Sequence, residues 1–481
     1  MPDYDLLIRR ARLIDGSGEA SVDGDLAVRD GRIAAMGDLG KATADRTIDA
    51  DGLALAPGFI DSHCHDDRAL IEMPLMEPKV SQGVTTVING NCGVSAAPFP
   101  AGRPEGPPPL NLINRSGTPG FESFRDYFAA LDETPAAINN ACLCGHINLR
   151  NAFMNEFDRP ATEREIEGMT ALLDQALSEG AIGLSTGLYY PPATAAPTSE
   201  VTAIARVLNR HNALYVTHMR DEEDHVTDSM EETFLIGREA NSPVVISHHK
   251  CTGQANFGKS EVTLKMIERA RENQTVGVDA YPYTASSTIL QPGRVKASSR
   301  VIITWSKPMP EATGRDLADI AAEMGCDPVE AAERLVPGGA VYFAMDEADV
   351  SRILAWPDTM IGSDGIIQDH HPHPRAWGTF PRVLGHYARD RGLFPLEQAV
   401  RKMTSLTAET FGLKGRGRLR EGYAADLVLF DPDTVIDSAT FADPKQPAAG
   451  IHMVFANGAA IWSDGAPTGA RPGQRLTRQA G

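Results

Sequence analysis

The first residues with obvious chemical potential lie in PGFIDSHCHDD, residues 57–67, directly after an apolar run. Two histidines, His63 and His65, stand two positions apart in this segment. The run before them is typical of a buried strand. Side chains at positions i and i+2 of a strand point to the same face, so both imidazoles can aim at one metal ion. A polar strand end with two solvated histidines is the alternative, and this motif alone leaves both open.

Further segments with strand character also end in residues that can do chemistry. Cys92 follows one strand, His218 another, His248 and His249 a third, and Asp364 a fourth. Taken singly, each has an ordinary explanation, because a buried cysteine packs as a small apolar residue and an aspartate caps a helix. Repetition of the pattern at one strand after another argues against coincidence and for a shared site.

The chemistry of this residue set points to zinc. Imidazole and thiolate ligands suit Zn²⁺, and a catalytic zinc site keeps one position open for water. Zinc lowers the pKa of that water to about 7. A nearby carboxylate can accept the proton and pass it to a leaving amine, and Asp364 is the candidate. The pattern therefore predicts a metal-assisted hydrolase that acts on a C–N bond.

These residues need a scaffold that brings distant strand ends together. The middle of the chain alternates strand patterns with helical ones such as residues 162–180 and 230–240, which predicts a (β/α)₈ barrel, the TIM-barrel fold. In that fold the carboxyl ends of the strands form the active-site face. The eight candidate strands are residues 58–65, 85–91, 140–147, 181–187, 214–219, 243–249, 276–283 and 359–365.

The two ends of the chain have a different sequence pattern from the middle. Residues 1–55 and 414–481 contain short alternating strands and turn signals, which predicts one small β-sandwich domain built from both termini. The barrel is expected to occupy residues 56–413. Residues 285–346 are too long for a loop and contain helical patterns at 314–325 and 327–336, so we expect an inserted α/β lid subdomain there.

The composition of the chain excludes some classes of binding partner and of cellular setting. The chain has 481 residues and a net charge of −19, which argues against nucleic acid or an anionic membrane as a partner. The sequence has no run of about 18 apolar residues, so we expect no membrane span. Its first residues lack the pattern of a signal peptide. The six cysteines do not read as a disulfide scaffold in a chain of this size, so a reducing cytoplasm is expected. Oligomeric state has no clear sequence signal.

Together these motifs resemble the D-aminoacylases, the N-acyl-D-amino-acid deacylases of the amidohydrolase superfamily. NGNCGVSAAP, GLSTGLYYPP, THMRDE, VVISHHKC, DAYPY and MIGSDG carry the resemblance, which runs nearly end to end. It implies hydrolysis of an N-acyl-D-amino acid to a carboxylate and a free D-amino acid, with Asp364 as general acid/base. It also implies one tight zinc site, a second weaker metal position at His63 and His65, and these tight ligands: Cys92, His218 and His248.

The resemblance also implies a set of substrate contacts. Tyr190 would polarise the scissile carbonyl. The substrate carboxylate needs cations and donors, for which the candidates are Lys250, Tyr281, Ser287 and Arg375. For the amino-acid side chain, Arg294 could meet an acidic group, whereas Tyr342 and Met345 could line an apolar pocket.

Two other readings remain open at this point. A cyclic-amide hydrolase of the dihydroorotase or hydantoinase kind shares the fold and the metal logic. The wider superfamily often bridges two metals with a carboxylated lysine from a middle strand, and residues 181–190 contain no lysine, which disfavours that reading. A catalytically inactive scaffold would have lost ligands, yet every candidate ligand and Asp364 are present.

Overall fold

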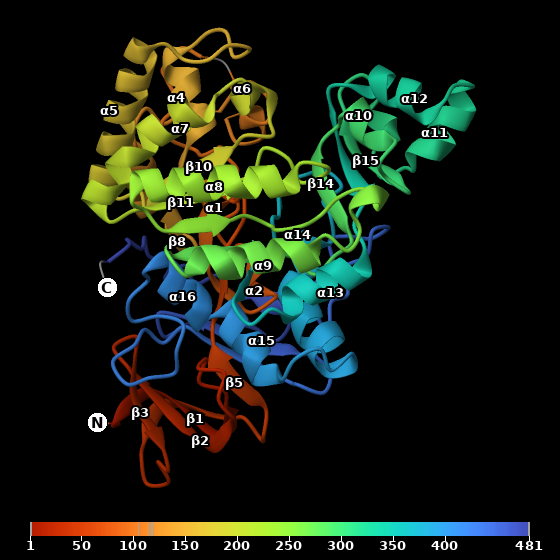
Figure 1. Cartoon of the computed structure of the whole chain (residues 1–481). Helices are drawn as coiled ribbons and strands as arrows, with labels where there is room; N and C mark the ends of the chain where they lie inside the picture. Colours follow the sequence, from red (N-terminus) through yellow and green to blue (C-terminus); the bar gives the residue numbers. More distant parts are fainter. Residues whose placement is uncertain (1, 104, 115–116, 119, 480–481) are drawn as a thin grey trace.

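The computed structural model describes residues 2–103, 105–114, 117–118 and 120–479. Figure 1 shows a central body of strands and helices, the N-terminal strands below it, and an arm at the upper right. Within the described residues, no helix has the length and apolar character needed to cross a bilayer.

Parallel strands form the centre of this body, and each of the eight predicted strand segments overlaps at least one of them, with residues 140–147 overlapping both β8 and β9. One sheet has the order β6-β7-β8 and the other the order β17-β13-β12-β11-β10-β9, with every pair parallel. Almost all of their residues are buried, as expected for strands covered on both faces. The bounds are β6 (Phe59–Asp61), β7 (Val84–Asn89), β8 (Asn139–Cys142), β9 (Cys144–Gly145), β10 (Gly183–Gly187), β11 (Leu214–His218), β12 (Val244–Ile246), β13 (Val276–Ala280) and β17 (Thr359–Ile361).

Backbone hydrogen bonds connect the two sheets at both ends of this series. On one side only Leu143 separates β8 from β9, and the amide of Ile182, just before β10, donates to Cys142 O on β8 over 2.8 Å. On the other side, the segments that follow β6 and β17 pair, because the amide of Asp364 donates to His63 O over 2.7 Å. The amide of His65 donates to Gly365 O over 3.1 Å. Two segments far apart in the sequence therefore run side by side just beyond the strand ends.

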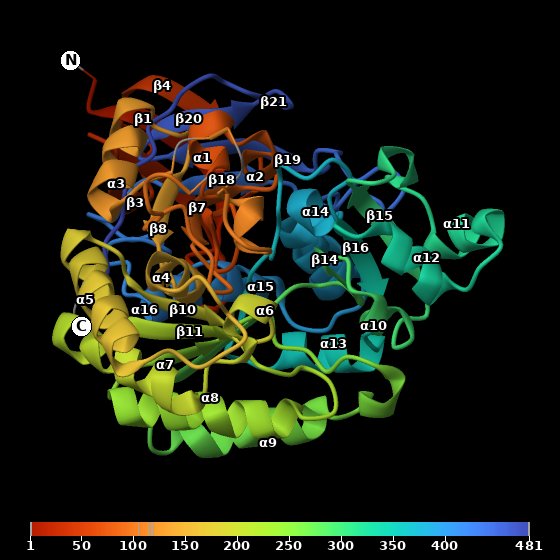
Figure 2. The same ribbon diagram turned by 90° about the horizontal axis from the view of Figure 1, so that it is seen from above.

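Helices cover the outside of these strands, and α8 and α9 lie side by side in both views (Figures 1 and 2). The prediction of a helix over residues 162–180 is confirmed by α5. Thr162 and Glu165 form a capping box at its start, and Gly180 ends it with a φ of 116°. The main covering helices are α3 (Phe124–Glu133), α4 (His146–Phe153), α5 (Glu163–Glu179), α7 (Thr198–Ala205), α8 (Val226–Ala240), α9 (Ser260–Arg271), α13 (Glu347–Ala355), α14 (Arg375–Arg382), α15 (Leu396–Met403) and α16 (Ser405–Phe411).

The two chain ends share one mixed sheet, in which most strand pairs are antiparallel and β1 pairs in parallel with β4 and β5. The pair β5–β18 joins them, with Leu427 opposite Pro57 and Phe430 opposite Ala54. Because one sheet contains strands from both termini, the small β domain is not a local unit of sequence. The sandwich arrangement stays a prediction. The strands are β1 (Tyr4–Leu13), β2 (Val22–Arg29), β3 (Arg32–Gly37), β4 (Ala44–Asp49), β5 (Ala54–Pro57), β18 (Leu427–Phe430), β19 (Ile451–Ala456), β20 (Ala459–Ser463) and β21 (Ala466–Pro467).

The long interval after β13 forms the arm. Its strands pair in the order β14-β16-β15, and its helices share an apolar cluster with them. Figure 2 shows this arm projecting sideways from the body. Since β14 begins shortly after β13 ends, the arm is attached at the carboxyl end of a central strand. Its elements are β14 (Ala285–Ile289), α10 (Pro292–Val295), β15 (Val301–Ser306), α11 (Leu317–Met324), α12 (Pro328–Leu335) and β16 (Gly338–Phe343).

Candidate active site

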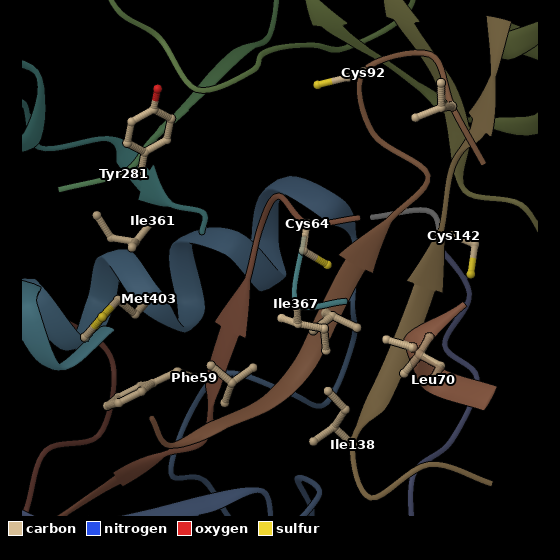
Figure 3. Packing of buried hydrophobic residues seen from close by; sticks show 14 of the residues in the cluster. Phe59, Cys64, Leu70, Cys92, Ile138, Cys142, Tyr281, Ile361, Ile367 and Met403 are labelled. Carbon is tan, nitrogen blue, oxygen red and sulfur yellow. The ribbon is translucent and has the colours of Figure 1, made fainter. Parts of the chain in front are cut away.

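Cys92 lies on a tight turn after β7, and glycines allow that turn. Cys92 has a φ of 53°, and Gly90 and Gly93 flank it with φ values of 76° and 78°. A Cβ on Gly90 would lie 2.1 Å from Leu143 O, and a Cβ on Gly187 would lie 2.2 Å from the carbonyl oxygen of Cys92. Because glycine has no Cβ at these positions, the turn that carries Cys92 can approach the neighbouring strands closely. Figure 3 shows Cys92 on this loop, well above the apolar side chains of Phe59 and Ile138.

Cys92, His218 and His248 form one group whose ligand atoms all lie within 4.8 Å of one another. Cys92 Sγ lies 3.4 Å from His248 Nε2, and the two imidazole rings are 4.4 Å apart. Both ring nitrogens of the buried His218 lack a hydrogen-bond partner among the described residues. Buried polar atoms normally have partners, so a metal ion would satisfy this group. His248 has a φ of 34°, held by its amide, which donates to Asp279 Oδ1 over 2.7 Å.

A second group shares Cys92 and contains His63, His65 and Asp364. His63 Nε2 lies 3.2 Å from Cys92 Sγ and 3.5 Å from Asp364 Oδ1. His65 Nε2 lies 3.2 Å from Asp364 Oδ1. The predicted pair of histidines therefore does converge with Asp364. Because the thiol belongs to both groups, it lies between two neighbouring candidate metal positions.

The charges around Cys92 and Asp364 favour their ionised forms. Burial alone would raise the pKa of the Cys92 thiol, but His63 and His248 outweigh it and hold that pKa well below its usual value. Burial would likewise raise the pKa of Asp364, and Arg375 and His248 instead hold it well below the ordinary range. Thiolate and carboxylate are the forms that bind metals.

Arg375, the first residue of α14, connects Asp364 to the arm. Its Nη1 lies 2.8 Å from Asp364 Oδ2, and its Nη2 donates to the carbonyl oxygen of Ser287 over 3.1 Å. Its guanidinium lies 4.5 Å above the Tyr281 ring. The Arg375 Nε and the Tyr281 hydroxyl are buried without a hydrogen-bond partner among the described residues. The unpaired Nε of this arginine and the unpaired hydroxyl of Tyr281 beneath it suit an anionic group of a ligand.

A cavity opens next to these groups. His65, Cys92 and Asp364 line it together with Tyr190 and Ser287. Burial and the Cys92 charge raise the pKa of the Tyr190 phenol well above its usual value, so the hydroxyl stays protonated and can donate. The rest of the wall is largely apolar: Val94, Pro109, Leu112, Ile113, Thr288 and Ile366.

Glu222 is the residue in this region that the sequence reasoning missed. Its Oε1 lies 3.0 Å from His248 Nδ1 and 2.7 Å from Lys250 Nζ. A carboxylate on the far nitrogen of a ligand histidine fixes the ring so that the other nitrogen faces the metal. The available signal was its position four residues after His218 in THMRDE. Lys250, expected to bind the substrate carboxylate, is therefore already paired with Glu222.

The structure places three predicted specificity residues outside this cavity. Tyr342 is fully buried in the arm, where it donates to Ile289 O and accepts from the amide of Gln291. Met345 lines a different cavity, with Lys250 and Tyr281. The expectation that Tyr342 lines an apolar pocket is therefore wrong, whereas Met345 does line a cavity, the one that it shares with Lys250 and Tyr281. Arg294 lies 5.3 Å above Tyr189 and lines an open pocket with Glu222, Glu223 and Gln291.

A cysteine and histidine ligand set at the carboxyl ends of parallel strands defines a class, the metal-dependent hydrolases. The amidohydrolase family model matches residues 46–461. The D-aminoacylase of Alcaligenes xylosoxydans xylosoxydans is 55% identical over 477 residues, which cover 99% of this chain and 98% of the relative. The chain therefore belongs to the amidohydrolase family, in its D-aminoacylase group.

Solved structures agree with this placement. A D-aminoacylase crystal structure superposes with a TM-score of 0.97 at 53% identity, covering 99% of this chain and 100% of the other. The N-acyl-D-glutamate deacylase of Bordetella bronchiseptica, solved with zinc and a phosphonate that mimics the tetrahedral intermediate, superposes with a TM-score of 0.95 at 48% identity. That match covers 98% of this chain and 99% of the deacylase.

Proposed function

We propose that this chain hydrolyses N-acyl-D-amino acids to a carboxylate and a free D-amino acid. The observation that carries the proposal is the convergence of the Cys92, His218 and His248 group with Asp364 and Arg375 beside one cavity. Two relatives that match over nearly the whole chain at 55% and 48% identity have this activity in their names. The substrate is a small molecule, and the net charge of −19 speaks against nucleic acid or an anionic membrane as a partner. We place the reaction in the cytoplasm.

We infer that the central strands form one closed (β/α)₈ barrel over residues 56–413. The backbone hydrogen bonds between the ends of β6 and β17 support closure, as does an apolar cluster that takes one residue or more from most of the strands. Residues 1–55 and 414–481 then form the small β domain. The arm at about 285–346 acts as a lid over the carboxyl ends of the strands, where β14 and Ser287 reach the cavity wall.

Zinc is the metal that fits the donor set. Cys92, His218 and His248 would hold the tight ion, because one thiolate and two imidazoles are typical zinc ligands and the His218 nitrogens have no hydrogen-bond partner among the described residues. His63 and His65 would form a weaker second position. Bound zinc supplies Lewis-acid chemistry, which polarises an amide carbonyl and lowers the pKa of water.

Asp364 acts as the general acid/base in this mechanism. Its carboxylate takes a proton from the attacking water and returns it to the leaving nitrogen as the C–N bond breaks. His65 and Arg375 contact different oxygens of Asp364, so its orientation is set from two sides. Tyr190, kept protonated, donates to the carbonyl oxygen as negative charge develops there.

Arg375, which contacts Ser287 at the cavity wall, and Tyr281, which lines the neighbouring cavity with Lys250, would bind the substrate carboxylate with their unpaired donors. Lys250 adds positive charge behind them, partly balanced by Glu222. The largely apolar wall that contains Val94 and Leu112 favours an apolar amino-acid side chain. The acyl carbonyl at the metal and the carboxylate at Arg375 leave one direction for that side chain.

This three-point arrangement predicts strong preference for the D enantiomer. An L substrate held by the same two anchors would direct its side chain into the wall, which should cost about 10²-fold or more in kcat/KM. The test is a panel of N-acetyl-D- and N-acetyl-L-amino acids, with D-leucine, D-methionine and D-glutamate as side chains. Hydantoins and dihydroorotate serve as cyclic-amide controls.

We expect N-acetyl-D-leucine and N-acetyl-D-methionine to be the better substrates and the cyclic amides to be inert. Equal rates for both enantiomers would contradict the three-point arrangement. If N-acetyl-D-glutamate is fastest and Arg294→Leu removes that preference, the side chain enters the pocket lined by Arg294 instead.

Glu222 offers a separate prediction about the metal. Replacing Glu222 with glutamine keeps the shape but removes the charge that orients His248, and such outer contacts contribute about 10–100-fold to metal affinity or activity. We expect zinc to dissociate about 10–100-fold more readily in a chelator titration. Glu223→Gln is the matched control, since Glu223 faces Arg294 and not His248. Unchanged zinc affinity in Glu222→Gln would refute this role.

A further inference from the structure

A fully buried lysine lies beneath the histidine motif and is not used by the proposed chemistry. Lys79 belongs to the short helix α2 (Glu77–Val80), and its Nζ donates to Asp61 Oδ2 over 2.6 Å and to Ser363 Oγ over 2.9 Å. Asp66 Oδ2 lies 3.1 Å from the same ammonium. Lys79, Asp61 and Asp66 all have no exposed side-chain surface. Burial alone would lower the pKa of Lys79, but Asp61 and Asp66 raise it, so the side chain stays charged.

The partners of Lys79 extend to both segments that carry the second group of site residues. Asp61 Oδ1 accepts from the amide of His63 over 3.2 Å and from the amide of Ser363 over 2.8 Å. Ser363 Oγ donates to Asp61 Oδ2 over 2.6 Å and accepts from the amide of Gly365 over 3.1 Å. One network of buried charges thus ties the segment before His63 to the residues on either side of Asp364.

Asp364 needs such support, because its backbone has a φ of 48°. This left-handed conformation is uncommon for residues other than glycine, although aspartate adopts it more readily than most, and surrounding hydrogen bonds stabilise it. The side chains of Asp61 and Ser363 bind the amides on both sides of Asp364, and the amide of Asp364 itself donates to His63 O. If this network relaxed, the Asp364 carboxylate would turn away from His65 and Arg375.

We propose that Lys79 is a positioning residue, which acts through Asp61 and Ser363 to hold Asp364 in its left-handed conformation and aim its carboxylate. The inference rests on the proposed function for its kinetic consequences. A buried ion pair is weak evidence for a role in stability, since the cost of desolvation offsets the attraction. Here the buried charges also have a positional effect. Through Asp61 and Ser363, Lys79 connects the two chain segments that carry site residues.

The test compares Lys79→Met with Lys402→Met, both measured on zinc-loaded protein well below its Tm. Lys402 is also buried, but its ammonium donates to Trp356 O, at the end of α13, and makes no hydrogen bond to either segment within the described residues. Removing an outer contact of this kind should lower kcat about 10–100-fold, and KM and the tight zinc should change little in Lys79→Met. Lys402→Met should keep the wild-type kcat.

A second readout does not depend on activity. Amide hydrogen exchange should become faster in peptides that cover residues 59–65 and 361–367 of Lys79→Met, and not in those peptides of Lys402→Met. Should Lys79→Met fail to fold, Ser363→Ala keeps every charge and removes only the hydroxyl link. It should show the same two effects with a smaller fall in kcat.

A wild-type kcat together with unchanged local exchange in folded Lys79→Met, or in Ser363→Ala, would overturn the proposal and leave Lys79 a purely structural residue. If the wild type hydrolyses no N-acyl-D-amino acid, the proposed function fails. The exchange measurement then decides the role of Lys79 by itself.

Discussion

Replacing Asp364 with asparagine is expected to lower kcat by about 10²–10⁴-fold, the usual contribution of a general acid/base. Asparagine has nearly the same shape and can still contact Arg375, so folding should be retained. Its amide cannot accept the proton of the attacking water or return it to the leaving nitrogen. KM for an N-acyl-D-amino acid should change much less than kcat, because Arg375, Tyr281 and the cavity wall remain.

Asp437→Asn is the matched control for this variant. Asp437 also pairs with an arginine of α14, Arg382, at 3.2 Å, but it does not line the cavity. Steady-state kinetics and zinc analysis of both proteins separate loss of the base from loss of the metal. Turnover near the wild-type level in Asp364→Asn, with zinc bound, would assign the proton transfer to another group.

Replacing Cys92 with alanine is expected to remove the tight zinc and nearly all activity. A methyl group is no metal ligand, and the remaining His218 and His248 are too few for a stable site. The loss should also disturb the second group, since Cys92 Sγ lies 3.2 Å from His63 Nε2. Metal analysis after dialysis against a weak chelator measures the bound zinc directly.

Two further variants calibrate that result. Cys142→Ala removes a buried thiol on β8 that belongs to neither ligand group, and it should keep zinc and activity. His63→Ala should retain the tight zinc and lose only the weaker position. One full equivalent of zinc in Cys92→Ala would contradict the ligand assignment.

Local sequence patterns were sufficient for the elements and for most of the site. The apolar runs that end at His63, Cys92, His218, His248 and Asp364 predicted strands with reactive ends, and each of these residues follows or ends a central parallel strand. Strand and helix periods depend on neighbouring residues only, so they can be read from a single chain. Gly90 and Gly93 stand in the segment NGNCG, but the atoms that they approach are known only from the structure.

The direction of side chains in the arm could not be predicted in the same way. Tyr342 lies on β16, whose alternating faces meet either the arm's own helices or the body of the protein. A strand pattern does not tell which face is which, because that depends on how the sheet packs against other elements. The expectation that Tyr342 lines a pocket was wrong for this reason, whereas Met345 does line a cavity with Lys250 and Tyr281.

The sequence by itself determined the ligand types, the strand ends that carry them and the family to which the chain belongs. Only the tertiary structure decided which charges meet: Glu222 with Lys250, Arg375 with Asp364, and Lys79 with Asp61 and Ser363. The reason is physical. A buried charge is stabilised by whichever partner the packing of distant segments brings within a few ångströms, and no local period in the chain records that distance.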